Sequence, residues 1–230
     1  MRPMFSYMGS KWRTAKKYPA PRHGLVIEPF AGGACYSLYW NCPKVLLYDS
    51  YPVIAGIWDY LIKVKESEVL SLPLEFESVE DLAICQEAKW LLGFWITKGN
   101  THPNKSRSAW ARKYKDSGDC KVWGAPVRDR IAKQVSQIRD WEIRCEDYNN
   151  APDVVADWFI DPPYKIKGKH YVKSEIDYKQ LSSFCTSRRG TVIVCENAGA
   201  EWLPFESFTD ARSTLGLSKE VVWIGHGTTL

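Results

Sequence analysis

Short apolar runs that end in a polar or glycine-rich turn recur along the chain. They are rich in β-branched and aromatic residues, which is typical of buried strands. The five runs span residues 24–30, 44–50, 141–147, 154–164 and 190–197. Between them, the segments 51–67 and 175–188 carry apolar residues at helical spacing. This alternation predicts an α/β fold with a mostly parallel sheet.

Two further segments change this picture. Residues 207–213 and 220–226 flank Leu215, Gly216 and Leu217 and predict a final antiparallel pair of strands. The region 70–137 breaks the alternation, because it begins as a helical pattern and then becomes irregular and basic. We therefore expect one domain formed by 1–69 and 138–230, with 70–137 as a largely helical insertion.

Polar groups end four of the five expected parallel strands, at Glu28, Asp49, Asp147 and Asp161. Ligands of parallel α/β sheets bind beyond the carboxyl ends of the strands, so these side chains predict a shared site. Asp49 is placed to bind a ribose hydroxyl pair or, alternatively, to cap the following helix. Asp147 and Tyr148 could border an adenine ring or form a surface turn.

Glycines follow the first of these strand ends, in the segment Glu28-Pro29-Phe30-Ala31-Gly32-Gly33. Glycine allows the backbone to approach a ligand closely, although a tight turn without a ligand explains the same residues. The segment lacks the G-x-G-x-x-G spacing of dinucleotide-binding turns.

The segment Asp161-Pro162-Pro163-Tyr164 carries the most specific signal. It follows the apolar run Trp158-Phe159-Ile160 directly. Proline has no N–H and a restricted backbone, so the Pro162 carbonyl is held rigidly. That carbonyl and the Asp161 carboxylate can together accept both hydrogens of an aromatic amino group, while Tyr164 can stack on the ring.

Charge is distributed unevenly, although the formal net charge is only +4. Residues 98–144 contain twelve Lys or Arg against five Asp or Glu, and residues 1–27 contain bases only. Tryptophan and tyrosine are interleaved with these bases, a pattern that suits a polyanion with stackable bases or a solvated basic surface.

Composition excludes some other classes. No apolar stretch approaches the roughly 20 residues of a membrane helix, and residues 1–5 lack the apolar core of a signal peptide. The seven cysteines show no zinc-finger spacing, so we expect reduced thiols, no metal and a cytoplasmic protein. A monomer is expected, since no oligomerisation stripe is apparent.

Taken together, these motifs resemble the Dam-like class of N(6)-adenine-specific DNA methyltransferases. The segment 5–11 is similar to the family's N-terminal Gly-Gly-Lys segment, 28–33 to its Glu-Pro-Phe-x-Gly motif, and 161–164 to its catalytic motif. The resemblance covers nearly the whole chain and follows the family's order of donor motifs, recognition region and catalytic motif. Ser10 and Ala34 replace glycines, and no Asn-x-Pro-x-Gly-like hairpin occurs, so the target sequence is not implied.

The resemblance implies a class I methyltransferase (Rossmann-like) fold that binds S-adenosylmethionine and double-stranded DNA. It implies catalytic roles for Asp161, Pro162 and Tyr164. The residues that it implies at the methyl donor are Tyr7, Lys11, Glu28, Phe30, Gly32, Gly33, Asp49, Asp147, Tyr148 and Asp161. Candidates for DNA contact are Lys11, Arg107, Arg112, Lys113, Arg128, Arg130, Lys165, Lys167 and Lys169.

The expected reaction moves a methyl group to the 6-amino group of an adenine flipped out of the duplex, without a metal or a covalent enzyme intermediate. Other substrates with a planar amino group remain alternatives: cytosine, an RNA adenine or a glutamine amide. A catalytically idle DNA-binding module is the alternative from a different class. The resemblance also implies a bacterial or phage origin, with either a solitary or a restriction-paired role.

Overall fold

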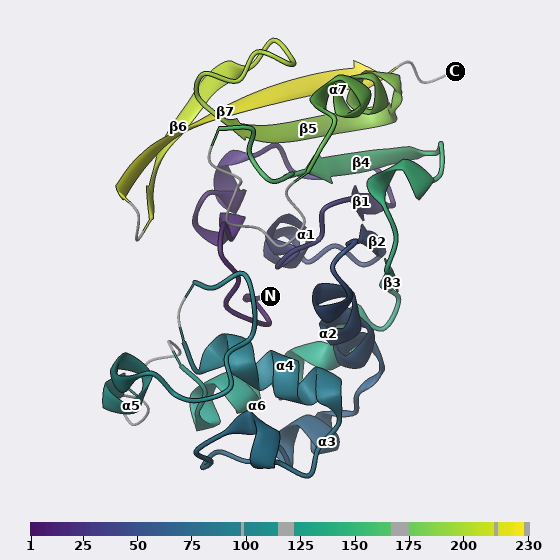
Figure 1. The fold of residues 1–230 in the computed structure, drawn as a ribbon. Helices are drawn as coiled ribbons and strands as arrows, with labels where there is room; N and C mark the ends of the chain where they lie inside the picture. Colours follow the sequence, from purple (N-terminus) through teal and green to yellow (C-terminus); the bar gives the residue numbers. More distant parts are fainter. Residues whose placement is uncertain (98, 115–121, 167–174, 214–215, 228–230) are drawn as a thin grey trace.

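The computed structural model describes residues 1–97, 99–114, 122–166, 175–213 and 216–227. Within these ranges, seven strands form one sheet in the order β3-β2-β1-β4-β5-β7-β6 (Figure 1). The strands are β1 Val26–Glu28, β2 Val45–Tyr48, β3 Glu142–Arg144, β4 Val155–Ile160, β5 Arg189–Asn197, β6 Glu206–Ser213 and β7 Gly216–Gly227.

The first five strands pair in parallel, whereas β7 is antiparallel to both β5 and β6. This sheet confirms the predicted Rossmann-like α/β fold with a C-terminal antiparallel pair. The last described strand, β7, lies between β5 and β6, so β6 and β3 are the two edge strands.

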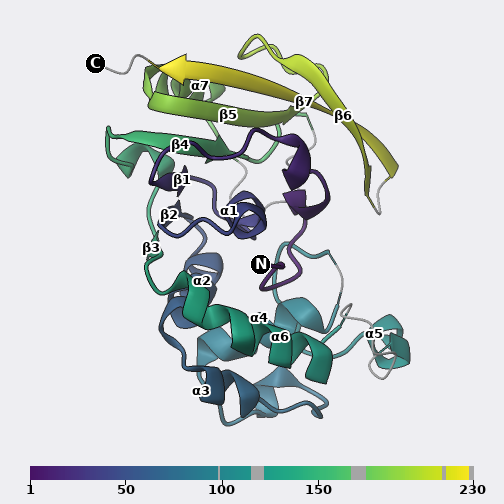
Figure 2. The same ribbon diagram turned by 180° about the vertical axis from the view of Figure 1, so that it is seen from behind.

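Two hydrophobic clusters cover the two faces of the sheet. Successive side chains of a strand point to opposite faces, and in β4 Phe159 belongs to one cluster while Trp158 and Ile160 belong to the other. The helix α7, Tyr178–Ser187, packs on the Trp158 face through Leu181 and Phe184. Helix α1, Cys35–Trp40, and the N-terminal segment lie on the Phe159 face (Figure 2).

The chain between β2 and β3 is largely helical. Its α-helices are α2 Pro52–Lys63, α3 Glu66–Leu70, α4 Gln86–Trp95, α5 Ala109–Tyr114 and α6 Ala125–Val135. Single turns of 3-10 helix occur at Lys11–Arg13 (η1), Ala15–Lys17 (η2), Val79–Asp81 (η3), Ser136–Ile138 (η4) and Tyr148–Asn150 (η5). Helices α3 to α6 lie together at the end of the molecule away from β6 and β7 (Figures 1 and 2).

Tryptophan side chains connect these helices to the rest of the chain. Trp95 of α4 donates its indole N–H to the Met4 carbonyl at 2.9 Å, and Trp58 of α2 donates to the Gly32 carbonyl at 2.8 Å. Both indoles are buried in the cluster on the Phe159 face, which also contains residues of α4 and α6. The region 70–137 therefore shares one core with the sheet, while its role as a recognition region stays a prediction.

The strand order places a crevice beyond β1 and β4. The chain proceeds from β1 outward to β2 and β3, and then returns to the other side of β1 as β4 and β5. Ligands of open α/β sheets bind at such a reversal, outside the carboxyl ends of the strands. Among the described helices, none is long and apolar enough to cross a membrane.

Candidate functional site

A cavity of about 590 Å³ lies at this reversal. All four acids that were predicted at strand ends, Glu28, Asp49, Asp147 and Asp161, line it. They come from four different strands or the turns that follow them, so the parallel sheet brings together groups up to 133 residues apart, Glu28 and Asp161. Tyr7, Lys11, Phe30, Gly32, Gly33 and Tyr148 also line the cavity, and so the structure gathers all ten predicted donor residues in one place.

The glycine turn after β1 is closely packed. Gly32 has a φ of +43°, and a Cβ on it would lie 3.2 Å from the Tyr7 ring. Its carbonyl accepts the Trp58 indole N–H at 2.8 Å, and its N–H donates to Asp49 Oδ2 at 3.0 Å. The turn is therefore held from the N-terminal segment, from α2 and from the end of β2.

Asp49 supports the backbone on two sides, because its Oδ1 also accepts the Tyr51 N–H at 2.9 Å. Burial raises the pKa of Asp49 to about 6, and the two backbone N–H groups oppose that rise. The helix-capping interpretation of Asp49 is wrong, because Tyr51 is the N-cap residue of α2 and its side chain makes no capping hydrogen bond. The Asp49 carboxylate instead accepts the N–H of Tyr51. This carboxylate still lines the cavity, where its remaining lone pairs can accept from a hydroxyl group.

Glu28 is more deeply buried, with a side chain only 2% exposed. Its Oε1 accepts the Ser37 N–H at 2.9 Å, which ties the end of β1 to helix α1. Burial raises the pKa of Glu28 to about 8, so the side chain is largely protonated at neutral pH. It can then donate a hydrogen bond as well as accept one.

Asp147 and Tyr148, which follow β3, form another part of the cavity wall. Asp147 Oδ1 accepts the Asn149 backbone N–H at 2.9 Å and caps the short helix η5. The Tyr148 ring is buried and lies 5.1 Å from the Phe30 ring, centroid to centroid. Both residues line the cavity, so the predicted acid and aromatic pair is at the site and also forms the predicted turn.

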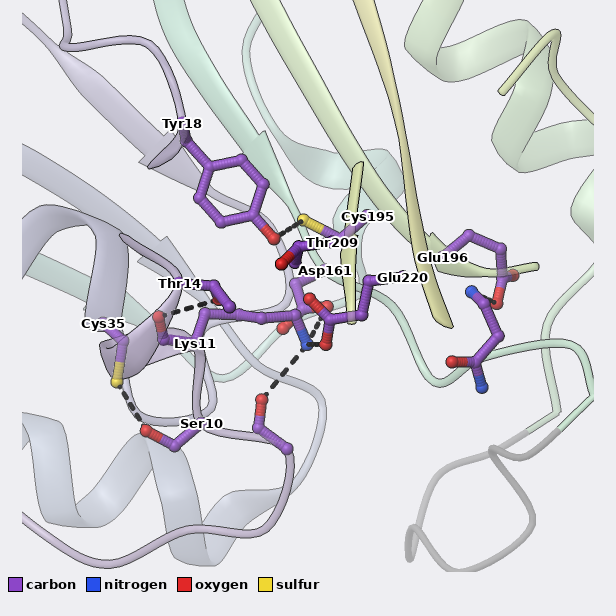
Figure 3. A network of polar contacts seen from close by, with 12 residues as sticks. Ser10, Lys11, Thr14, Tyr18, Cys35, Asp161, Cys195, Glu196, Thr209 and Glu220 are labelled. Atoms are coloured by element: carbon purple, nitrogen blue, oxygen red, sulfur yellow. Dashed lines mark hydrogen bonds and ion pairs between the residues drawn. The ribbon is translucent and has the colours of Figure 1, made fainter. Parts of the chain in front are cut away.

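Lys11 joins the N-terminal segment to the end of β4. Its side chain is 6% exposed, and its Nζ lies 3.1 Å from Asp161 Oδ1 and 3.6 Å from Glu220 Oε1 (Figure 3). The same ammonium donates to the Gly9 carbonyl at 3.2 Å and lies 4.8 Å from the centre of the Tyr164 ring. One cation thus faces two carboxylates and an aromatic ring.

Asp161 lies at the end of β4 and lines the cavity with a side chain 21% exposed. Burial raises its pKa, while the Lys11 ammonium opposes that rise. Of the other predicted catalytic residues, Pro162 is buried and Tyr164 packs against the core. Neither of these two is among the residues that line the cavity. The Lys11 ammonium lies over the Tyr164 ring.

The segment after β4 is anchored on both sides of Tyr164. The Tyr178 hydroxyl of α7 donates to the Pro163 carbonyl at 2.6 Å. Glu196, at the end of β5, accepts the Lys165 N–H at 3.1 Å and the Trp202 indole N–H at 3.0 Å. Lys167 and Lys169, two predicted DNA contacts, lie outside the described residues.

The remaining predicted DNA contacts differ in exposure. Arg112 and Lys113 are exposed on α5, and Lys165 is exposed beyond the catalytic motif. Arg128 and Arg130 are partly buried, since Arg128 pairs with Asp129 at 3.0 Å and Arg130 donates to the Pro3 carbonyl at 2.8 Å.

Arg107 has a different environment from the one that its position in a basic segment suggested. Its side chain is 7% exposed and donates to the Leu74 carbonyl at 2.6 Å and to the Trp123 carbonyl at 3.2 Å. The guanidinium also lies 4.9 Å from the centre of the Phe76 ring. We assign it to holding the helical region together and leave it out of the candidate DNA surface.

Sequence reasoning missed three buried residues next to Asp161. Glu220 of β7 faces Lys11, and Cys195 of β5 donates to the Tyr18 hydroxyl at 3.3 Å beside them (Figure 3). In the antiparallel pairing of β5 and β7, Glu220 is opposite Asn197, two residues after Cys195. Glu220 precedes the apolar run 221–224, and charged residues are almost never fully buried unless paired, so its burial could not be read from the sequence.

Comparisons with known proteins give little guidance. No model of a known protein family matches the chain, and no curated protein matches it either. Among solved structures, a conserved hypothetical protein of Streptococcus pyogenes is similar over 92% of this chain and 89% of that chain. The two chains are 10% identical, and the TM-score is 0.37. Function therefore has to be argued from the site.

The chemistry of the site follows from its two parts. The cavity offers carboxyl groups and aromatic rings, which suit a ligand with hydroxyl groups and a flat heterocycle. In the cavity lining, the largely buried Asp161 offers a hydrogen-bond acceptor near the Tyr164 ring. Among the described residues, no group of three or more His, Cys, Asp or Glu side chains is arranged to hold a metal ion.

Proposed function

We propose that this protein transfers a methyl group from S-adenosylmethionine to the 6-amino group of an adenine in double-stranded DNA. The observation that carries the proposal is that Asp161, at the end of β4, lines the same cavity as Glu28, Asp49, Asp147 and Tyr148. Residues suited to bind the nucleoside part of the donor therefore lie next to Asp161, which can accept a hydrogen bond from the target amino group.

The residues of the cavity fit the methyl donor. A volume of about 590 Å³ is within the range of small-molecule sites, roughly 300–1,000 Å³. Asp49 supplies an acceptor for ribose hydroxyls, and Phe30 with Tyr148 supplies an aromatic wall for adenine. When bound, the donor supplies an electrophilic methyl carbon on a sulfonium.

Asp161 has the main chemical role in this proposal. It accepts an N–H of the adenine amino group, with the Pro162 carbonyl as the second acceptor, and so directs the nitrogen lone pair out of the ring. That lone pair forms the new N–C bond as the methyl–sulfur bond breaks, and Asp161 stabilises the positive charge on nitrogen. The amino proton then leaves to Asp161 or to water.

Exposed cations suit the DNA backbone. Arg112 and Lys113 of α5 and Lys165 after the catalytic motif are exposed, although Arg112 also lies 3.8 Å from the Glu77 carboxylate. An adenine inside a duplex cannot reach Asp161, so the base has to leave the stack before the reaction. Tyr164 is the ring on which it would stack.

The test is to incubate the protein with S-adenosylmethionine and mixed-sequence duplex DNA and to identify methylated nucleosides by mass spectrometry. We expect N(6)-methyladenine, and a loss of at least about 100-fold in Asp161→Ala. Asp140→Ala is the matched control, because Asp140 is an exposed aspartate outside the cavity.

Three outcomes would change the proposal. Methylcytosine, or product from an RNA sample alone, would move the substrate and keep the mechanism. Methylated glutamine in a protein would do the same. A protein that does not bind S-adenosylmethionine in a thermal-shift assay would exclude the proposed transfer.

A further inference from the structure

The Lys11 ammonium occupies the position that the proposed function assigns to the target amino group. It lies 3.1 Å from Asp161 Oδ1 and 4.8 Å from the centre of the Tyr164 ring. A target adenine needs the same two contacts, because its amino group donates to Asp161 and its ring stacks on Tyr164. The two nitrogens cannot occupy this place together, so Lys11 has to move when the base enters.

Glu220 is the neighbouring group to which the ammonium can move. Its Oε1 already lies 3.6 Å from Lys11 Nζ, and its side chain is 9% exposed. Among the described residues, its Oε2 is buried without a hydrogen-bond partner, and so is Asp161 Oδ1, which Lys11 faces as an ion pair. A buried carboxylate oxygen without a donor is costly. When the target amino group donates to Asp161, an ammonium that moves to Glu220 leaves neither carboxylate without a donor.

The two carboxylates differ in their access to the substrate. Asp161 lines the cavity, whereas Glu220 is not among the residues that line it. Glu220 projects from β7 toward the Lys11 ammonium (Figure 3). A shift of Lys11 toward Glu220 would thus expose Asp161 and the Tyr164 ring without separating the cation from a counter-charge.

We propose that Glu220 is a positioning residue that holds the Lys11 ammonium away from Asp161 when the target amino group binds. This inference rests on the proposed function. Glu220 does not touch the substrate and acts through Lys11. Before the base binds, Lys11 forms an ion pair with Asp161. When Lys11 moves to Glu220, the Asp161 carboxylate can accept the hydrogen bond from the target amino group.

A double-mutant cycle tests this role, using Glu220→Gln, Lys11→Met and the double variant. Glutamine keeps the shape of Glu220 but removes its charge, so Lys11 stays on Asp161. We expect Glu220→Gln to lower kcat about tenfold while KM for S-adenosylmethionine stays within about twofold of the wild-type value. In the Lys11→Met background, the same substitution should change kcat by less than about twofold.

Glu206→Gln is the matched control, because Glu206 is an exposed glutamate on the adjacent strand β6. It should leave kcat at the wild-type value. Equal losses from Glu220→Gln in both backgrounds would overturn the inference, since a purely structural role does not depend on Lys11. An unchanged kcat in Glu220→Gln would overturn it as well.

Thermal unfolding of the same variants supplies a readout without activity. Lys11→Met leaves two buried carboxylates without their cation and should lower Tm by several degrees, on the order of 5 °C. Adding Glu220→Gln should restore part of that loss. Strictly additive Tm shifts would show that the two side chains are not coupled and would overturn the inference.

The two proposals fail in different ways. A wild-type protein that methylates nothing would overturn the proposed function and this inference together. An active wild-type protein whose cycle is additive would overturn the inference alone.

Discussion

At the scale of single residues, the acids of the site are not independent of one another, because they are buried together and two of them face the same cation. Asp161 and Glu220 face one ammonium, and burial raises the pKa of both. Among the described residues, no ion pair forms with Glu28, and its carboxyl group accepts the Ser37 backbone N–H. The sequence showed which acids end the strands, but burial, which controls their charge, depends on the packed structure.

Glu28 should make the stability of the protein depend on pH. Burial raises its pKa from an ordinary value of 4.5 to about 8 in the folded protein, so the folded state retains a proton that the unfolded state has lost. Stability from this group is therefore present below about pH 4.5 and falls as the pH rises to about 8, by at most about 1.4 kcal/mol per pH unit.

Glu28→Gln removes this titration and keeps the side-chain shape. The free energy of unfolding of Glu28→Gln, relative to wild type, should rise between pH 5 and pH 8, as measured by urea unfolding at several pH values. A difference that stays the same at every pH would contradict the assigned burial of the carboxyl group.

At the scale of elements, the hydrophobic pattern located the sheet well. Runs 44–50 and 190–197 correspond to β2 and β5, and the segment 175–188 contains α7. The expected helix 51–67 is divided, because α2 ends at Lys63 and α3 begins at Glu66. Local pattern could not show that β7 lies between β5 and β6, since pairing between strands depends on contacts distant in sequence.

Strand β5 supports the end of β4 through a close approach at Gly190. This glycine has a φ of +98°, and a Cβ on it would lie 2.1 Å from the Ala156 carbonyl oxygen. Ala156 is its partner in the β4–β5 register, five residues before Asp161. Space and backbone conformation both require glycine here.

Gly190→Ala should destabilise the protein by at least about 2 kcal/mol in urea unfolding, because both the clash and the strained φ act on two central strands. Gly24→Ala is the matched control, since a Cβ on Gly24 meets nothing within 4 Å. Its effect should be within about 1 kcal/mol. Equal effects from both substitutions would be inconsistent with the β4–β5 contact described above.

At the scale of the whole molecule, the charge pattern predicted a basic region but not which bases face outward. Arg107 and Lys113 belong to the same basic segment, yet Arg107 is buried against backbone carbonyls and Lys113 is exposed. Sequence alone could not separate them, because a buried arginine becomes recognisable only when the carbonyls that it satisfies are in place.

These two residues should therefore respond differently to substitution. Lys113→Met should reduce the dependence of log affinity for duplex DNA on log salt by about 1, with the Tm unchanged. Arg107→Met should lower the free energy of unfolding by about 3 kcal/mol, since it leaves two buried carbonyls without donors.

Fluorescence anisotropy with a labelled duplex at several salt concentrations, together with thermal unfolding, measures both effects. If Arg107→Met were fully stable and reduced the salt dependence as Lys113→Met is expected to do, the structural role of Arg107 would be rejected.

The position of β7 between β5 and β6 has a consequence for any chain that ends before this strand. Without residues 216–227, the long edge of β5 has no partner on the side that β7 occupies, and Lys11 has only one of its two carboxylates. An unpaired edge of this kind invites pairing with other chains. A product cut short within this strand should therefore be both prone to aggregation and inactive.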